Sequence, residues 1–211
     1  MEKQRKIYQT IKVIGIGSCW CRNVDLIDKL YDVDEYILLD TDIKSLQKNI
    51  NDTKLYMPFV RRISGRLIGE KSFEGLGVNT YKQGEQAATE SKKSIMEALQ
   101  GIDIVFIMAG LGGCTGTSVT PIVASYAKNI GANIIGVVTM PFSFEGEKRR
   151  NVAIESVKKL RQYTNNVVLF ENEDILKEDL SVKVSEALKL RYADYSEKFR
   201  EVFKKMNIAM V

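Results

Sequence analysis

The sequence predicts an α/β fold: a doubly wound, mostly parallel sheet with helices on both faces. Short, continuous runs of β-branched and other apolar residues are typical of strands buried on both faces of a parallel sheet. Segments with helical periodicity alternate with these runs along the chain, as they do in βαβ units. Sheets of this kind bind ligands beyond the carboxyl ends of their strands, so functional residues are expected in the loops that follow the strands.

The N-terminal half is expected to hold two strands, three helices and an irregular segment. The apolar run at 11–16 predicts the first strand, a helix follows at 24–31, and Tyr-Ile-Leu-Leu at 36–39 predicts the second strand. Residues 43–49 and 84–99 show the apolar spacing of amphipathic helices. Between them, residues 51–82 lack a clear period and contain Pro58 and several glycines, which predicts an extended strand-and-loop excursion.

The C-terminal half continues the alternation. Strands rich in Ile and Val are expected at 104–109, 134–139 and 167–170, and helices at 118–130, 147–163 and 181–206. The last helix carries an apolar stripe at three- and four-residue steps, formed by Leu188, Tyr192, Tyr195, Phe199, Val202 and Met206. We therefore expect one domain, residues 1–211, that ends with this long helix and lacks a second domain.

The composition excludes several classes of function. With 211 residues, 45% hydrophobic content and a net charge of +4, the chain is typical of one soluble domain, and nucleic-acid binding is not expected. No apolar stretch is long enough for a membrane span, and no signal peptide precedes the first strand, which predicts a cytoplasmic protein without membrane insertion. The chain contains no histidine, which excludes histidine-dependent triads and histidine metal sites.

The glycine-rich run from Gly110 to Ser118 is the main functional signal. It follows an apolar strand and precedes a helix, where backbone N–H groups and the positive helix end can hold a phosphate. A Walker motif is excluded because the chain contains no Gly-Lys pair. A dinucleotide fingerprint is partly present, since Gly15 and Gly17 close the first strand and Asp40 the second, but Trp20 replaces its third glycine.

The segment Gly112-Gly113-Cys114-Thr115-Gly116-Thr117-Ser118 resembles the Gly-Gly-Gly-Thr-Gly-Thr-Gly loop of the tubulin/FtsZ GTPase superfamily. Further matches follow in the order of that family: residues 11–17, Asp40-Thr41-Asp42 for Asn-Thr-Asp, 138–146 for Val-Thr-x-Pro-Phe-x-Phe-Glu-Gly, 171–176, and Ala193-Asp194. The resemblance covers nearly the whole chain. It implies a Rossmann-like, FtsZ-like N-terminal nucleotide-binding domain that takes GTP or GDP, accompanied by Mg²⁺.

The resemblance also implies roles for individual residues. Glu145 would bind the ribose, while Asn172 and Asp194 would bind the guanine base. The Asp194 carboxylate can accept from both N1–H and the N2 amine of guanine, which adenine does not offer. The phosphates would lie against Gly17, Arg22, Gly110, Gly112, Gly113, Thr115, Gly116, Thr117 and Arg149. Glu145 and Arg149 also fit an exposed i,i+4 ion pair, and Asn172 fits an ordinary turn.

The chain departs from the pattern of the family in three places. Trp20 limits the approach of a phosphate to the first loop, where Arg22 can substitute as a cation. The loop from Gly75 to Asn79 is shorter than usual, which leaves the preference for a di- or triphosphate open. Ala209 stands where the resemblance places a carboxylate that completes the GTPase site of the next subunit, so hydrolysis by this chain alone is expected to be weak or absent.

Three cysteines, Cys19, Cys21 and Cys114, lie in loops that face one another in the resembling fold. They are interpreted first as small residues that fill loop positions, because structural metal sites usually have four ligands. The alternative is an iron–sulfur or other thiolate-bound metal site at the phosphate pocket.

The first expectation for function is nucleotide-dependent self-assembly in a cytoskeletal or cell-division role, with copies of the chain or other FtsZ-like subunits as partners. The second is a non-polymerising accessory protein of the same fold that uses the cysteines for a metal or redox site. A Rossmann-type NAD-binding enzyme is the third.

Overall fold

The computed structural model describes residues 9–18, 33–56 and 62–174, with the backbone alone at 55 and 56. The predicted helices at 24–31 and 181–206 lie outside these ranges, as do Cys19, Cys21, Arg22 and Asp194. The single-domain boundary with its long final helix therefore stays a prediction.

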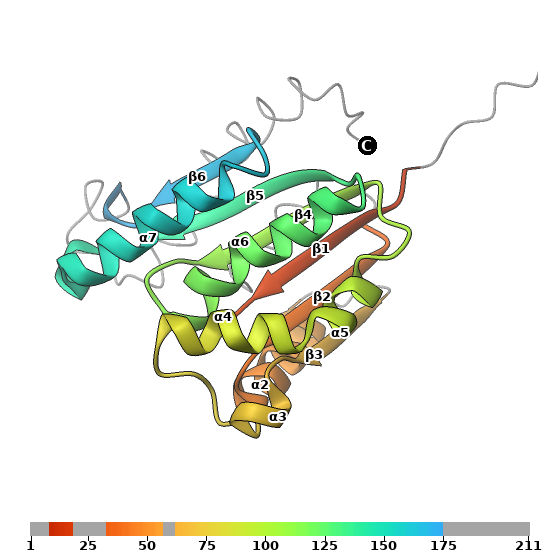
Figure 1. Ribbon diagram of the computed structural model, residues 1–211, viewed down its shortest axis with the longest axis horizontal. Coiled ribbons are helices and arrows are strands. Elements are labelled where there is room, and N and C mark those ends of the chain that lie inside the picture. The colour runs from red at the N-terminus through yellow and green to blue at the C-terminus, as the bar shows by residue number, and fades with distance from the viewer. Residues whose placement is uncertain (1–8, 19–32, 57–61, 175–211) are drawn as a thin grey trace, which may run out of the picture.

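A six-stranded sheet forms the centre of the described chain, in the order β3-β2-β1-β4-β5-β6 (Figure 1). Every neighbouring pair of strands is parallel, which confirms the predicted sheet. The strands are β1 (Ile11–Ile16), β2 (Glu35–Asp40), β3 (Ile63–Leu67), β4 (Ile104–Gly110), β5 (Asn133–Met140) and β6 (Val167–Glu171). The order reverses between β1 and β4, so the loops after these two strands diverge and open a crevice between them.

Five strands agree with their predicted bounds to within one residue. The sixth, β3, lies inside the excursion at 51–82, which had no separate strand assigned to it. β3 is an edge strand, and all five of its residues are half-buried. Its sequence, Ile-Ser-Gly-Arg-Leu, therefore lacks the apolar run that marks the central strands.

Helices cover both faces of the sheet (Figure 1). α4 (Tyr81–Glu90), α5 (Lys92–Ala98), α6 (Cys114–Asn129) and α7 (Glu147–Leu160) pack on one face, against alternate strand residues such as Ile14 and Ile107. α2 (Ile43–Tyr56) packs through Leu46 on the other face, against Val13 and Leu38. Two short helices complete the set, α3 (Glu70–Phe73) and the 3₁₀ turn η2 (Ser143–Glu145).

The helix boundaries differ from the prediction at two informative places. The helix expected at 84–99 is interrupted at Ser91, whose side chain accepts a hydrogen bond from Gly69 N–H at 2.9 Å. α6 begins at Cys114 rather than at 118, so half of the glycine-rich run is the first turn of a helix. Glycine has low helix propensity, and the pattern therefore indicates a loop where tertiary packing makes a helix.

In the part of the chain that the structure describes, no helix has both the length and the apolar character that a bilayer crossing requires.

Candidate functional site

A cavity of about 600 Å³ opens at the carboxyl edge of the sheet, above the point where the strand order reverses. Loops after β1, β2, β4, β5 and β6 contribute to its wall, together with the segment before α4. The residues that line the cavity include Gly17, Asp40, Thr41, Asp42, Ser45, Leu76, Gly77, Asn79, Gly110, Gly113, Cys114, Thr115, Gly116, Pro141, Glu145, Arg149 and Asn172. The cavity therefore lies at the carboxyl ends of the strands, where the sequence predicts functional residues.

The floor of the cavity is the turn from β4 into α6. Gly112 has φ +102°, a conformation that favours glycine, and its N–H donates to Thr117 Oγ1 at 2.8 Å. A Cβ on Gly116 would lie 2.2 Å from the carbonyl oxygen of Gly110, so only glycine lets the helix start this close to the strand. These two glycines bring the N-terminus of α6 directly to the cavity wall.

Four residues at the start of α6 line the cavity: the N-cap Gly113, then Cys114, Thr115 and Gly116. The first turn of a helix has unpaired N–H groups and a partial positive charge, which together favour an anion. Gly17 approaches the same turn, since a Cβ on it would lie 3.5 Å from Gly116 N. The arrangement is therefore suited to a phosphate held between the loop after β1 and the start of α6.

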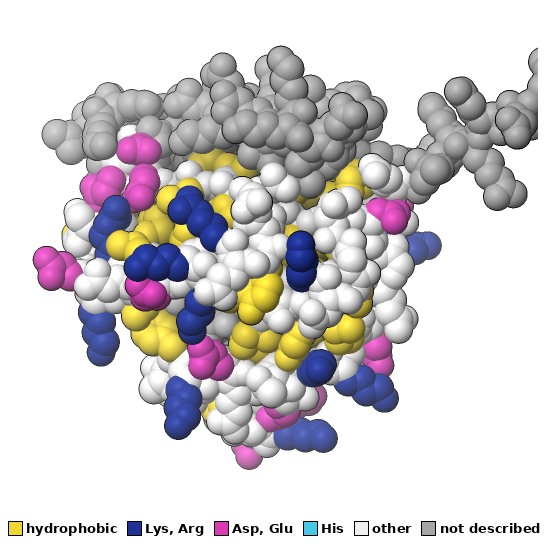
Figure 2. All heavy atoms as spheres, turned by 45° about the horizontal axis from the view of Figure 1, so that its top comes forward, with side chains coloured by type: hydrophobic (Ala, Val, Ile, Leu, Met, Phe, Trp, Pro, Cys, Tyr) yellow, Lys and Arg dark blue, Asp and Glu magenta, His cyan; other side chains and the backbone are white. Residues whose placement is uncertain are grey.

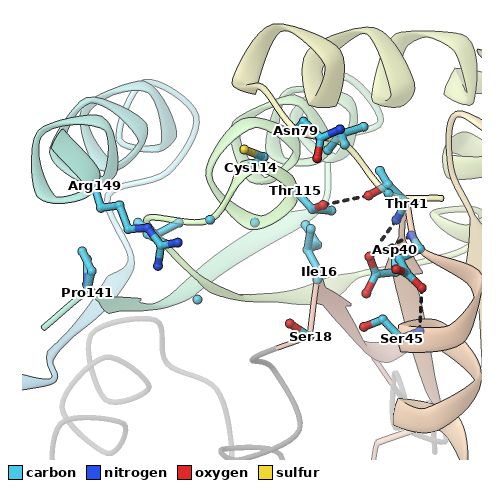
Figure 3. A pocket seen from close by; sticks show the side chains of 18 of the residues that line it. Ile16, Ser18, Asp40, Thr41, Ser45, Asn79, Cys114, Thr115, Pro141 and Arg149 are labelled. Atoms are coloured by element: carbon cyan, nitrogen blue, oxygen red, sulfur yellow. Dashed lines mark hydrogen bonds between the residues drawn. The ribbon is translucent and has the colours of Figure 1, made fainter. Parts of the chain in front are cut away.

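One end of the cavity carries an arginine (Figure 3). Arg149 of α7 lies on the opposite side of the cavity from Asp40, with Thr115 between them. The guanidinium of Arg149 donates to Glu145 Oε2 at 2.7 Å, and Glu145 Oε1 accepts from Phe142 N–H at 3.0 Å. The i,i+4 ion pair that the sequence allowed is thus formed, and both of its members also line the cavity.

The other end is acidic. Asp40 closes β2, and its Oδ1 accepts from Thr41 N–H at 2.7 Å and from Asp42 N–H at 3.3 Å. Its Oδ2 is buried and has no hydrogen-bond partner among the residues that the structure describes. Burial raises the pKa of Asp40, and the Asp42 charge acts in the same direction, while the nearby Ser45 side chain and the N–H groups of Asp42 and Thr41 oppose the increase only in part.

Hydroxyl and backbone contacts join this acidic end to the turn from β4 into α6. The Thr41 and Thr115 hydroxyls are hydrogen-bonded, with 2.9 Å between the two Oγ1 atoms (Figure 3). Gly77 N–H donates to the Thr41 carbonyl at 3.0 Å, which fixes the glycine-rich segment before α4 against the turn after β2. Three segments far apart in sequence therefore form one continuous wall.

Eight of the predicted site residues lie on this one cavity: Gly17, Gly110, Gly113, Thr115, Gly116, Glu145, Arg149 and Asn172. Gly112 and Thr117 do not line it; their mutual hydrogen bond shapes the turn instead. Thr117 is buried, and its carbonyl accepts from the Ser156 hydroxyl at 2.6 Å, which ties α6 to α7.

The structure adds residues for which the prediction gave no site role, above all Asp40, Thr41, Asp42, Ser45 and Asn79. The signal was present, because Asp40 ends a strand parallel to β1 and carboxyl ends of parallel strands meet at one edge. The sequence does not predict which end of the cavity each loop forms.

The thiolate metal hypothesis gains no support from the described residues. Among them, no group of three or more acidic, cysteine or histidine side chains could hold a metal ion. Cys114 is a free, half-buried thiol on the cavity wall. Cys19 and Cys21 lie outside the described ranges.

The charged surface is mixed on the face shown in Figure 2. Lys and Arg side chains lie apart from one another there, among neutral and acidic side chains. Such a surface is typical of a soluble domain.

Comparison with known proteins identifies the family. Residues 10–178 match the model of the GTPase domain of the Tubulin/FtsZ family. The chain belongs to the tubulin/FtsZ family. This result confirms the resemblance carried by the glycine-rich loop and the motifs in register with it.

Solved structures agree with this membership. An empty FtsZ dimer from M. jannaschii superposes with a TM-score of 0.73 and 31% identity, covering 91% of this chain and 53% of that one. CetZ2 from Haloferax volcanii, solved as a GTPγS-bound protofilament, gives a TM-score of 0.72 and 18% identity over 92% of this chain and 59% of that one. TubZ from Clostridium botulinum phage c-st gives a TM-score of 0.62 and 20% identity, over 92% of this chain and 58% of that one. This chain thus spans little more than half the length of the proteins to which it is compared.

Proposed function

We propose that this tubulin/FtsZ-family domain binds a guanine nucleotide, GTP or GDP, in the cavity at the start of α6. The observation that carries the proposal is the convergence of the α6 N-terminus, the Thr115 hydroxyl and Arg149 on one cavity of about 600 Å³. Helix N–H groups and a guanidinium are the donors that protein sites use most for phosphate oxygens. The nucleotide in the FtsZ-like arrangement would place its phosphates there.

The two ends of the cavity support an orientation for the nucleotide. Glu145 and Asn172 lie at the Arg149 end, where a carboxylate and an amide can accept from ribose hydroxyls and pair with a base edge. The acidic end, with Asp40 and Asp42, lies beside the start of α6, where the cation that accompanies the phosphates would offset its negative charge. The ribose and base would therefore lie toward β6, with the first phosphate between Arg149 and the start of α6 and the terminal phosphate toward β2. Asp194, assigned by resemblance, would complete the guanine contacts.

The Mg²⁺ ion that accompanies a nucleoside triphosphate would be held chiefly by phosphate oxygens. The described residues provide no cluster that could bind a metal ion without the nucleotide. A cation bound in this way enters and leaves with the nucleotide.

We further propose that nucleotide binding sets contacts between copies of the chain. CetZ2 in its protofilament and dimeric FtsZ are examples of assembly in the same fold. Hydrolysis by this chain alone would be weak or absent, since Ala209 stands at a position where the resemblance places a carboxylate.

The deciding experiment is a titration of the purified protein with GTP, GDP, ATP and NAD by calorimetry. We expect GTP and GDP to bind at least tenfold more tightly than ATP and NAD, because the guanine edge is read by a carboxylate. Asp194→Ala should remove most of that preference. Tight binding of ATP or NAD without a preference for guanine would overturn the proposal and favour an NAD-binding enzyme.

A matched pair of variants tests the position of the phosphates. Arg149→Gln should lower the affinity for GDP by about tenfold or more, since a charge-assisted hydrogen bond contributes about 1.5–3 kcal/mol. Lys148→Gln removes a neighbouring positive charge from the same helix, at an exposed residue that is not part of the cavity wall. Equal losses in the two variants would indicate a nonspecific effect of net charge rather than a contact.

A further inference from the structure

Tyr81 joins two segments that line the cavity, the one before α4 and the turn from β4 into α6. Its hydroxyl donates to the carbonyl oxygen of Gly112 at 3.0 Å, across 31 residues of sequence. Tyr81 is the first residue of α4, and the helix start is fixed by a capping box in which Thr80 and Gln83 exchange hydrogen bonds. The helix therefore presents the Tyr81 hydroxyl to the phosphate loop at a defined position.

The accepting carbonyl belongs to the peptide that joins Gly112 to Gly113. The described chain contains no cis peptide, so this bond is trans, and the carbonyl oxygen and the following N–H point in opposite directions. Holding Gly112 O toward Tyr81 thus turns the Gly113 N–H away from Tyr81. Gly113 lines the cavity, and no hydrogen bond among the described residues uses its N–H.

The Gly112–Gly113 peptide needs such a contact to stay in one orientation. It lies between two glycines, which have the widest choice of backbone conformations. The groups on either side of it are fixed: Gly112 N–H donates to Thr117 Oγ1 at 2.8 Å, and the Gly113 carbonyl accepts from Thr117 N–H at 3.2 Å. Of the contacts described, only the Tyr81 hydroxyl holds the carbonyl of this peptide.

The Tyr81 hydroxyl is suited to donate at neutral pH. Burial raises the pKa of Tyr81, and Cys114 raises it further, while Arg149 acts in the opposite direction. The hydroxyl therefore keeps its proton well above neutral pH.

We propose that Tyr81 is a positioning residue, which orients the Gly112–Gly113 peptide so that the Gly113 N–H meets a phosphate of the bound nucleotide. This inference rests on the proposed binding of a guanine nucleotide. It gives the segment before α4 a direct part in phosphate binding, although the Tyr81 side chain itself does not line the cavity.

The test compares Tyr81→Phe, which removes only the hydroxyl, with Tyr126→Phe as a matched control. Tyr126 is also a half-buried tyrosine whose pKa is raised by burial, and its ring lies 5.6 Å from the Lys92 amine, away from the cavity. Affinities for guanosine, GDP and GTPγS are measured by calorimetry or by competition with a fluorescent guanine nucleotide. Thermal unfolding without nucleotide reports the integrity of each variant.

We expect Tyr81→Phe to lower the affinity for GDP and GTPγS by about fivefold, the usual effect of one lost hydrogen bond. The affinity for guanosine, which lacks phosphate, should stay within about twofold, and the control should leave all three affinities unchanged. If the role of Tyr81 were merely structural, Tyr81→Phe would lower the affinities for guanosine and GDP to the same extent, and that result would overturn the proposal.

Unchanged affinities for all three ligands would also overturn it. Failure of the wild-type chain to bind GDP would instead count against the proposed function itself, so the two failures are distinguishable. As a second readout, the ¹⁵N–¹H signal of Gly113 in the nucleotide-free protein should shift in Tyr81→Phe and not in Tyr126→Phe. An unshifted Gly113 signal in Tyr81→Phe would contradict the proposed orientation.

Discussion

At the scale of single residues, the cavity separates its charges. Arg149 lies at one end and Asp40 at the other, with the start of α6 between them (Figure 3). Arg149 is paired with Glu145, whereas one oxygen of Asp40 is buried without a hydrogen bond. Asp40 is only 5% exposed, so its charge is costly in the folded protein.

This cost gives a prediction for stability. The pKa of Asp40 is raised in the folded protein, so protonated Asp40 favours folding. This stabilisation is fully present below the ordinary Asp pKa, near 3.9, and is lost as the pH rises through the pKa of Asp40 in the folded protein. Asp40→Asn keeps an oxygen for Thr41 N–H and removes the charge. We expect it to raise the free energy of unfolding by about 1 kcal/mol at pH 7.5, and by less at pH 4, in urea denaturation.

The control for Asp40 is Asp52→Asn, which breaks an i,i+4 pair with Lys48 on the surface of α2. Pairs of this kind contribute about 0.3–0.5 kcal/mol, so a small loss of stability is expected at both pH values. A loss of stability in Asp40→Asn at both pH values would contradict this prediction, because it would show that the Asp40 carboxylate stabilises the fold.

Glu145 has two readings at the residue scale, an exposed ion pair and a ribose contact. Glu145→Gln should change the free energy of unfolding by less than about 0.5 kcal/mol, because surface i,i+4 pairs contribute little. It should lower the affinity for GTP by about fivefold to tenfold, since a hydrogen bond to a charged acceptor is lost. With 2′,3′-dideoxy-GTP the difference between variant and wild type should vanish, and an equal loss with that ligand would refute the ribose contact.

At the scale of elements, the site depends on how closely α6 approaches β4. Gly116 allows this approach, because a Cβ there would lie 2.2 Å from a backbone oxygen that cannot move independently. Gly113, three residues earlier on the same turn, has open space around the position of a Cβ and a φ of −82° that any residue adopts. The two glycines therefore differ sharply in their tolerance of a methyl group.

Gly116→Ala should lower the free energy of unfolding by roughly 2 kcal/mol or more and abolish nucleotide binding, because α6 must move away from the strand. Gly113→Ala should cost no more than about 1 kcal/mol, the difference between a favoured and a poor N-cap residue. Urea denaturation and GDP titration of both variants measure these effects. Similar behaviour of the two variants would contradict the packing described here.

At the scale of the whole molecule, two large apolar side chains are exposed on the face that carries the cavity. Leu76 is 80% exposed on the cavity rim, and Phe144 is 72% exposed beside Glu145, with its ring stacked on Phe142 at 4.9 Å. Apolar side chains exposed together at a surface are one mark of a contact with another protein. Leu76 and Phe144 are therefore candidates for the proposed nucleotide-dependent contact between copies.

We therefore expect more of the protein to pellet on ultracentrifugation with GTP than with GDP. Phe144→Ser should reduce the pelleted fraction by at least half, while the GTP affinity stays within about twofold. Ile130→Ser is the control, because Ile130 is also exposed but caps the opposite end of α6. A pelleted fraction that does not depend on the nucleotide would favour a non-polymerising domain.

Most of the fold could be predicted because the central strands are buried on both faces. Ile, Val and Leu are then favoured at successive positions. β4 is an unbroken apolar run, and β1 and β5 are apolar at most of their positions. The edge strand β3 and the break at Ser91 lack such a signal, since each depends on partners distant in sequence. Predicted site residues that follow a motif, such as Gly113, Thr115 and Arg149, line the cavity, whereas the prediction omitted residues whose side chains meet only through the fold.

The sequence by itself determined the parallel sheet, the place of the glycine-rich turn after β4 and the family, because each depends on local pattern and on motifs in register. Only the tertiary structure decided that the glycine-rich run is half helix, and that the turn after β2 faces it with a buried carboxylate. Only it decided that Tyr81 holds the Gly112 carbonyl. The physical reason is the same in each case: burial and hydrogen bonding between distant segments override local propensity, and no local pattern records which segments will meet.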